Sequence, residues 1–247
     1  MGESKNKFSL SRNIPAEIAR QLRQEAGFGC VICGCSLITY EHIINFSDVD
    51  QHRVEDMAVL CENCHGKVTR KQLSKEYVRQ KKGNPKALED GFAHDIFFAT
   101  SEQPTVTIGN FTMRNIGIHL MVGSDPIIHI KGPSVEGEPV LLNLMLADES
   151  GFKIVEIVDN QWRVNRDNWD VETNANRMTF RKRKGCITLE IEFQAPDTFR
   201  ITRLNMLHKG RRIYFDRKGL HLRNNEGGSI NLSGRGRAEY CSIGILM

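Results

Sequence analysis

The sequence predicts an α+β protein in which a small metal-bound module at the amino end precedes a larger, mostly-β domain. Two observations carry this prediction. Five of the seven cysteines lie between residues 30 and 64, and short runs of alternating apolar and polar residues begin near residue 106. A length of 247 residues with 40% apolar side chains suffices for one large or two small domains. No apolar run approaches the ~18 residues that a membrane span needs, so no membrane partner is expected.

The amino-terminal elements follow in order. Residues 1–12 are polar, and we expect no packed element there. Asn13 is expected to cap a helix whose first turn contains Pro15 and which ends near Gly27 or Gly29. The β-branched and aromatic run 37–44 predicts a short hairpin. A single helix is then expected from the second cysteine pair to Gly83, where Gly, Asn and Pro start a linker.

Two Cys-x2-Cys pairs indicate a structural zinc site. This paired spacing brings four thiolates into a tetrahedron around Zn²⁺, and cysteines of a reducing compartment are more often metal ligands than disulfides. Cys35 could replace Cys33 as a ligand. The predicted ligands are Cys30, Cys33, Cys61 and Cys64.

The distal part of the chain has the period of half-buried strands. Apolar side chains alternate with polar ones most clearly from residue 187 to 193, and similar runs cover 111–122, 126–130, 141–146, 153–158, 199–207, 212–215 and 230–232. Glycine-containing turns separate several of them. The pattern predicts a sandwich, a barrel or a short solenoid. The expected division is a zinc-bound domain at 1–88, a linker at 89–104 and a β domain at 105–247.

Positive charge gathers in two places. Residues 66–82 contain seven Lys or Arg residues and a single acid, and residues 177–247 contain 15 Lys or Arg residues against six Asp or Glu residues. The first group follows the second cysteine pair directly, and we expect it to contact nucleic-acid phosphates. A candidate second surface in the basic third comprises Arg177, Arg181, Lys182, Arg183 and Lys184, with Arg211 and Arg212. The predicted phosphate contacts of the first group are Lys67, Arg70, Lys71, Lys75 and Arg79.

Three further side chains lie close to the cysteine pairs in sequence. Glu41 and His42 are adjacent within the segment between the pairs, and His65 directly follows Cys64. If both pairs bind one Zn²⁺, a carboxylate and two imidazoles can converge on one cleft. Such a group suits a second, catalytic metal ion. His52 is interpreted as an ordinary loop residue.

At these positions the chain resembles the HNH endonucleases, the ββα-metal family. The resemblance covers roughly residues 12–82 and depends on the two cysteine pairs, on Glu41-His42, on residues 56–60 and on the Cys64-His65 step. It implies a ββα-metal fold around a zinc ribbon with four cysteine ligands. It also implies that Glu41 and His65 bind a catalytic Mg²⁺ or Mn²⁺ and that His42 is the general base.

The family pattern also assigns a loop-orienting residue shortly before the second cysteine pair. That position is Asp56 here, where the family usually has Asn, and Asn45 stands where the family often has Pro. An Asp could add a metal ligand or disturb the loop. Both departures bear on activity, while the predicted metal ligands and base are intact.

Residues 1–7 contain no apolar stretch of signal-peptide length, so a cytoplasmic location is expected. The resemblance implies a metal-dependent enzyme that hydrolyses DNA phosphodiester bonds, most simply in double-stranded DNA. Fusions of this kind resemble restriction or phage-defence effectors. Two alternatives stay open: a catalytically decayed zinc-ribbon module that binds nucleic acid, and a ribonuclease that uses the same site. The β domain resembles no family, and recognition, sensing, oligomerisation and binding of a partner protein are its candidate roles.

Overall fold

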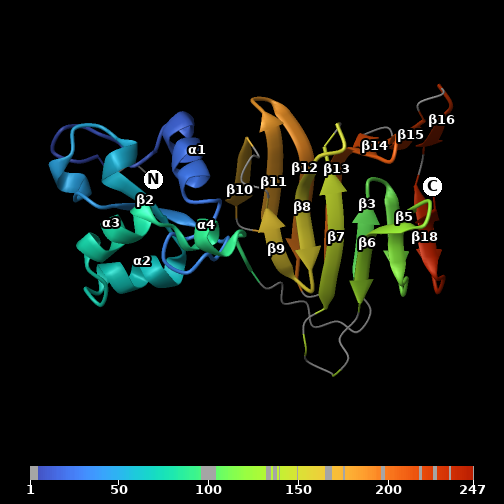
Figure 1. Cartoon of the computed structure of the whole chain (residues 1–247), viewed down its shortest axis with the longest axis horizontal. Helices are drawn as coiled ribbons and strands as arrows, with labels where there is room; N and C mark the ends of the chain where they lie inside the picture. The colour runs from blue at the N-terminus through green and yellow to red at the C-terminus, as the bar shows by residue number, and fades with distance from the viewer. Residues whose placement is uncertain are drawn as a thin grey trace. The chain divides into compact units, whose positions relative to one another are not determined.

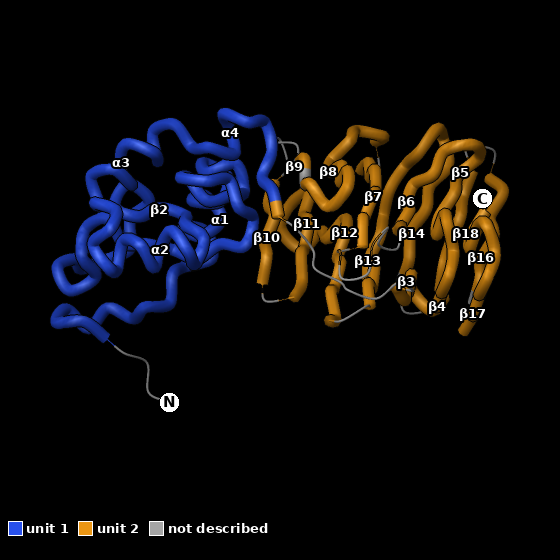
Figure 2. The backbone as a smooth tube through the Cα atoms, turned by 90° about the horizontal axis from the view of Figure 1, so that it is seen from below, with its two compact units in different colours: residues 1–94 blue, residues 95–247 orange. Residues whose placement is uncertain are grey.

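The chain forms two compact units, Met1–His94 and Asp95–Met247 (Figure 2). The structure is a computed structural model, and each unit is described by itself. The first unit extends to His94, beyond the expected boundary at residue 88, and residues 96–103 of the expected linker lie outside the described residues. The described residues are 5–95, 104–131, 135, 138, 140–148, 150–164, 169–174, 176–195, 198–216, 219–224, 227–233 and 235–246.

The first unit is a short β-ribbon surrounded by helices (Figure 1). Its apolar core contains Leu22 of the first helix, Val68 and Val78 of two later helices, and the whole second strand. The elements are α1 (Ala16–Glu25), β1 (Thr39–His42), η1 (Phe46–Asp48), η2 (Val54–Asp56), β2 (Met57–Leu60), α2 (Glu62–Thr69), α3 (Lys75–Gly83) and α4 (Lys86–Asp90).

The predicted hairpin at 37–44 is wrong in its pairing. Only β1 forms in this run, and it pairs antiparallel with β2, with His42 opposite Met57 and Glu41 opposite Ala58. The apolar residues of β2 are all buried, so this strand forms the centre of the core and leaves β1 at the surface of the ribbon. The order strand, strand, helix then places β1 beside the start of α2.

The single basic helix expected after the second cysteine pair is also wrong. The chain forms α2 and α3, separated by a turn in which Lys71 adopts a left-handed φ of 59°. Ser74 explains the break, because its hydroxyl accepts a hydrogen bond from the Tyr77 N–H at 3.1 Å and so caps a new helix. The basic residues of this segment therefore lie on two separate helices and on the turn between them.

Residues 5–12 are held in place by contacts with the rest of the unit, contrary to the expectation, and residues 1–4 lie outside the described residues. The side-chain amide of Asn6 donates hydrogen bonds to the carbonyl oxygens of Phe46 and Val49, at 2.6 and 2.7 Å. The guanidinium of Arg12 lies 4.6 Å from the centre of the Phe46 ring. These contacts tie the segment to the loop that follows β1.

The second unit consists of two β-sheets (Figure 1). The six-stranded sheet has the order β18 (Ile243–Leu246), β5 (Ile118–Val122), β6 (Asp125–Lys131), β7 (Leu141–Ala147), β8 (Lys153–Val158) and β9 (Gln161–Val164). The ten-stranded sheet has the order β10 (Asp170–Asn174), β11 (Arg177–Arg183), β12 (Cys186–Gln194), β13 (Thr198–His208), β14 (Arg211–Asp216), β15 (Gly219–Arg223) and β16 (Ser229–Ser233), with β3 (Thr105–Ile108) parallel to β13, β4 (Phe111–Arg114) beside β3, and β17 (Gly236–Glu239) beside β4.

The two sheets face each other as two layers (Figures 1 and 2), so the sandwich is the architecture adopted among the three predicted. The layers are joined by the Leu207 N–H, which donates to the Asp148 carbonyl at 2.8 Å, and by His208 and Asp125, whose side chains lie 2.6 Å apart. In the central strands, side chains such as Met178 and Phe180 of β11 are buried between the layers. The opposite face of the larger sheet is polar.

Among the described residues, no helix is both long and apolar enough to cross a membrane.

One polar side chain in this core has no hydrogen-bond partner. His119 in β5 is 1% exposed, and neither of its ring nitrogens has a partner. Burial, with a smaller contribution from His129, lowers the pKa of His119 to about 4. Protonation is therefore easier in the unfolded chain, where a histidine pKa is about 6.5.

The unfolding free energy of the second unit should fall as the pH falls from about 6.5 towards 4, because the unfolded state takes up the His119 proton first. Above this window His119 is neutral in both states and contributes nothing. The loss should approach roughly 3 kcal/mol at the acidic end, and His119→Leu should remove most of it. Denaturant unfolding followed by the fluorescence of Trp162 and Trp169, both in this unit, measures the effect. An equal pH dependence in the variant and the wild type would contradict the prediction.

Candidate functional site

The first cysteine pair lies on a tight turn. The Gly34 N–H donates to the Cys30 carbonyl at 2.8 Å, and the Cys30 N–H donates to the Cys35 carbonyl at 2.8 Å. Gly34 has a φ of 80°, a left-handed conformation that glycine adopts without strain. The turn therefore presents Cys30 and Cys33 to the same side.

The second pair opens α2. Cys61 is the N-cap residue of this helix, and its sulfur accepts a hydrogen bond from the Cys64 N–H at 3.4 Å. A helix amino terminus favours negative charge on a nearby sulfur. Both sulfurs of the pair are thereby held near the helix start.

The two pairs meet in one cluster. The sulfur atoms of Cys30, Cys33, Cys61 and Cys64 all lie within 4.8 Å of one another. The Cys33 sulfur is 3.6 Å from that of Cys61 and 3.9 Å from that of Cys64. Tetrahedral zinc with bonds of about 2.3 Å places its sulfur ligands about 3.8 Å apart. The four thiols thus fit a tetrahedral metal site, and Cys35 lies outside the cluster.

The charge state of the thiols also favours a cation. Burial and the neighbouring Cys30 and Cys61 raise the pKa of Cys64 to about 12. Because like charges repel at these distances, the four groups cannot all ionise without a positive ion between them. A bound divalent cation removes this repulsion and converts the thiols into thiolate ligands.

Glu41 is the centre of a second polar group. Its carboxylate is 8% exposed, and one oxygen lies 2.9 Å from Nε2 of His65. β1 provides Glu41 and the first turn of α2 provides His65, so the pairing of β1 with β2 brings the two together. The contact between these two predicted ligands is the main polar feature beside the thiol cluster.

Lys75 also contacts Glu41. Its ammonium lies 3.3 Å from the other carboxylate oxygen and donates to the His42 carbonyl at 2.5 Å and to the Asn45 side chain at 2.9 Å. Lys75 was predicted to contact phosphate, yet it is half-buried at the start of α3. Its charge compensates that of a nearly buried carboxylate.

His42 has different neighbours. Nε2 of His42 lies 3.2 Å from Nδ1 of His52, and the ring centroid lies 5.2 Å from that of Phe46. Among the described contacts, the imidazole of His42 has none with Glu41 or His65. Burial first, and then the positive charges nearby, lower the pKa of His42 to about 4. The imidazole is therefore neutral at physiological pH.

Asp56 acts here through its backbone. Its carbonyl accepts a hydrogen bond from the Ile43 N–H at 2.8 Å, which extends the ribbon by one residue beyond His42. The Asp56 carboxylate lies near Lys82, whose pKa is lowered by burial and raised in part by this neighbouring negative charge. The predicted loop-orienting residue thus lies where the loop rejoins β2.

The other predicted phosphate contacts are exposed on two elements and the turn between them. Lys67 belongs to α2, Arg70 and Lys71 to the turn, and Arg79 to α3. Arg79 forms an exposed ion pair with Glu76 at 2.7 Å. These four cations therefore follow no single helix face.

His52 belongs to the site although the sequence predicts an ordinary loop residue at this position. It is 7% exposed although it lies in a loop, and it contacts His42 on one side and the Ser11 carbonyl on the other. Its neighbours in the sequence, Gln51 and Arg53, are exposed and polar. No local periodicity distinguishes such a residue, so only the fold reveals it.

Replacing Cys61 with Ser should lower the zinc content of the purified protein far below stoichiometric and unfold the first unit, because small zinc folds derive their stability from the ion. Cys35→Ser is the matched control and should retain both zinc and fold. Atomic emission measures zinc, and limited proteolysis of the first unit measures folding. A folded, zinc-free Cys61 variant would show that the cluster is not a structural metal site.

Comparison with known proteins assigns no family. No family model, no curated protein and no solved structure matches the chain. The functional argument therefore depends on the geometry of the first unit. The relevant features of this unit are the four-thiol cluster, the Glu41–His65 contact and the buried neighbours of His42.

Proposed function

We propose that the chain is a metal-dependent endonuclease of the HNH type that hydrolyses DNA phosphodiester bonds. The contact between Glu41 and His65 carries the proposal, because it joins a carboxylate and an imidazole beside the thiol cluster in the order that the family pattern requires. The succession of β1, β2 and α2 supports it. His42 follows Glu41 directly on β1 and is the proposed base.

The spacing of the two proposed ligands suits a hard divalent cation. Adjacent ligands of an octahedral ion with bonds of 2.0–2.1 Å lie about 3 Å apart. The Glu41 oxygen and Nε2 of His65 are 2.9 Å apart. His65 is 39% exposed, which leaves one side of the pair open to water and to a phosphate. Mg²⁺ or Mn²⁺ bound there would offset negative charge on the scissile phosphate and the departing oxygen.

His42 supplies what the hydrolysis needs from the protein. A neutral imidazole can accept a proton from an attacking water, and burial keeps His42 neutral. The imidazole packs beside the rings of both Phe46 and His52, which limits its rotation. The exposed cations Lys67, Arg70 and Lys71 are suited to hold the nucleic-acid backbone near it.

One contact favours a different function, a binding module without catalysis. The Lys75 ammonium already compensates the charge of Glu41, so the carboxylate has a partner without any metal ion. Asn45, which replaces the proline that the family often has, accepts one of the hydrogen bonds of this lysine. In this reading the site binds nucleic acid through the cations of α2 and α3 and cuts nothing.

His42→Ala should reduce plasmid cleavage in Mg²⁺ or Mn²⁺ by about 100-fold or more, since a positioned general base contributes 10²–10⁴-fold. Binding of the plasmid should persist. His94→Gln, in the same unit but outside the Glu41 group, is the control and should cleave at the wild-type rate. Labelled DNA and RNA tested side by side identify the preferred substrate. Binding without cleavage by the wild type would support the binding module, and equal cleavage by the wild type and His42→Ala would exclude His42 as the base.

A further inference from the structure

The hydrogen bonds of His52 determine which nitrogen of His42 carries a proton. Nε2 of His52 lies 2.9 Å from the Ser11 carbonyl oxygen, which can only accept a hydrogen bond. Nε2 of a neutral His52 must therefore carry the proton, and its Nδ1 is then an acceptor. His42 approaches this acceptor with its own Nε2, at 3.2 Å.

We infer that His52 is a positioning residue that holds His42 in the Nε2–H tautomer, with Nδ1 left as the proton-accepting atom. The chain of groups runs from the Ser11 carbonyl through His52 to His42. This inference rests on the proposed function, because it assigns the atom of the base that would receive the proton from water.

The surroundings of His52 fix its ring in this position. The ring is 7% exposed and stacks on Phe46, with a centroid distance of 6.2 Å and an angle of 16° between the planes. Asn6 ties the Phe46 loop to the amino-terminal segment that also provides Ser11. The segment before α1 therefore contributes to the site through Ser11, whose carbonyl sets the tautomer of His52 and, through it, that of His42.

Two substitutions separate a hydrogen-bonding role from a packing role. His52→Phe keeps the ring and removes both nitrogens. His52→Gln keeps one acceptor and one donor in a single planar group, which can bond His42 and the Ser11 carbonyl as the imidazole does. Zinc content and proteolysis show whether each variant is folded.

The measured quantity is the tautomer of His42. It is read from ¹⁵N NMR of the histidine rings in the full zinc-loaded chain at neutral pH. The signal that disappears in His42→Ala identifies His42. We expect the Nε2–H pattern in the wild type and in His52→Gln, and a mixture of tautomers in His52→Phe. In the cleavage assay, His52→Phe should lower kcat by roughly 10- to 100-fold with little change in KM, because it removes part of the contribution of the general base. His52→Gln should retain most of the wild-type kcat.

An Nδ1–H pattern in the wild type, or a His52→Phe variant with unchanged tautomer and kcat, would overturn the inference. Absence of cleavage by the wild type would instead refute the proposed function. The NMR pattern would still decide whether the hydrogen-bond chain orients His42.

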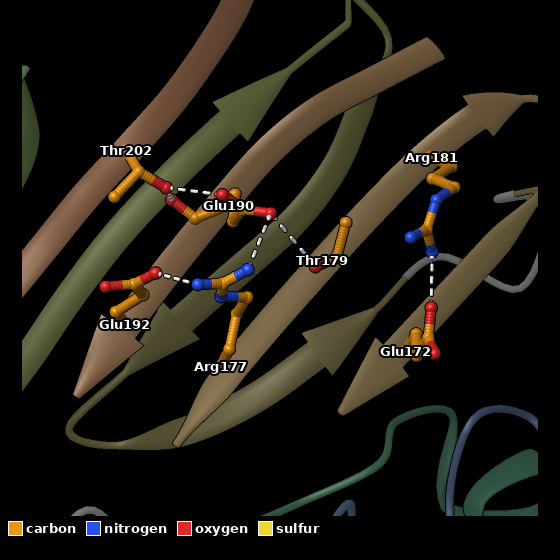
Figure 3. Close-up of polar contacts among 7 residues, drawn as sticks. All are labelled: Glu172, Arg177, Thr179, Arg181, Glu190, Glu192 and Thr202. Carbon is orange, nitrogen blue, oxygen red and sulfur yellow. Dashed lines mark hydrogen bonds and ion pairs between the residues drawn. The ribbon is translucent and has the colours of Figure 1, made fainter. Parts of the chain in front are cut away.

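A separate observation concerns the polar outer face of the larger sheet in the second unit. Most charges of β10–β12 on this face neutralise one another (Figure 3): Arg177 pairs with Glu192 and Arg181 with Glu172. Glu190 lies among them and accepts a hydrogen bond from Thr202 at 2.7 Å. The candidate second surface expected from Arg177 and Arg181 is therefore occupied by internal ion pairs.

The excess positive charge lies instead on β13–β15. Arg203, Arg212 and Arg223 are exposed, and none of them forms an ion pair within the described part of the chain. The register places Tyr214 and His221 opposite each other on the same face, and their rings stack at 4.6 Å. We call these five residues the arginine face.

The arginine face combines cations with aromatic rings. The guanidinium carbons of Arg212 and Arg223 lie 5.5 and 5.8 Å from the centre of the Tyr214 ring. A hollow of about 520 Å³ beside them is lined by Arg203, Arg212 and Tyr214, with Glu190 at its β12 side. Tyr214, on β14 between β13 and β15, thus contacts His221 and also lines this hollow.

We propose that the arginine face binds a nucleic-acid strand through its phosphates. Guanidinium groups without an acidic partner suit phosphate oxygens, and a tyrosine beside them offers a surface for a base or sugar. This second proposal also deepens the proposed function, because it assigns a substrate contact to the β unit. It is independent of His52.

The test is the salt dependence of binding to a short fluorescein-labelled DNA duplex, measured by anisotropy with the full chain in a His42→Ala background that prevents cleavage. The double substitution Arg212→Gln and Arg223→Gln should weaken binding and reduce the slope of log Kd against log salt by about two, one for each lost phosphate contact. Lys131→Gln with Lys153→Gln removes the same charge from exposed positions on the six-stranded sheet and should leave the slope nearly unchanged.

Equal slopes for the arginine-face variant and the wild type would overturn this proposal. A reduced slope would support it whether or not the wild type cleaves DNA. The result therefore does not depend on the outcome of the cleavage assay.

Discussion

The first unit depends on the requirement that four thiols share one small volume. Their sulfurs lie within 4.8 Å of one another, and at that separation their charges can coexist only around a cation. This constraint joins the turn before β1 to the start of α2, two segments about thirty residues apart in the sequence. The pairing of β1, which follows the first cysteine pair, with β2, which precedes the second, also holds these two segments together. Glu41 and His65 meet because both belong to segments that the cluster holds.

The Glu41 group shows how the unit tolerates a carboxylate with 8% exposure. One oxygen contacts the His65 imidazole and the other faces the Lys75 ammonium, which compensates the negative charge. A metal ion at this position would have to displace or share these partners. The ammonium of Lys75 also has two neutral acceptors, the His42 carbonyl and Asn45, and these can keep it bound near the site when the carboxylate turns to a cation. The same contacts therefore suit both a metal-free and a metal-bound carboxylate.

Features encoded by local spacing could be predicted from the sequence, and features that depend on loop contacts could not. The cysteine pairs and the period-two strands are local patterns, and both are present in the structure. The partner of β1 was predicted wrongly because a strand does not reveal its partner, and the fully apolar β2 lies beyond a long loop. His52 escaped prediction for a related reason. Its contacts, to His42 and Ser11, span 10 and 41 residues and follow no period.

Charge is the property for which composition misleads most in this chain. The basic carboxyl third suggested that Arg177 and Arg181 contact a polyanion, yet strand register places a glutamate opposite or diagonal to each of them. Cross-strand pairs of opposite charge stabilise a sheet and leave little net field above it. On β14 and β15 the register instead places Arg212 opposite Leu207 and Arg223, and Tyr214 opposite Asn205 and His221. Arg203 of β13 is opposite Glu190. The surface available to an anion is thus determined by which strands pair and in which register, not by the number of basic residues in the segment.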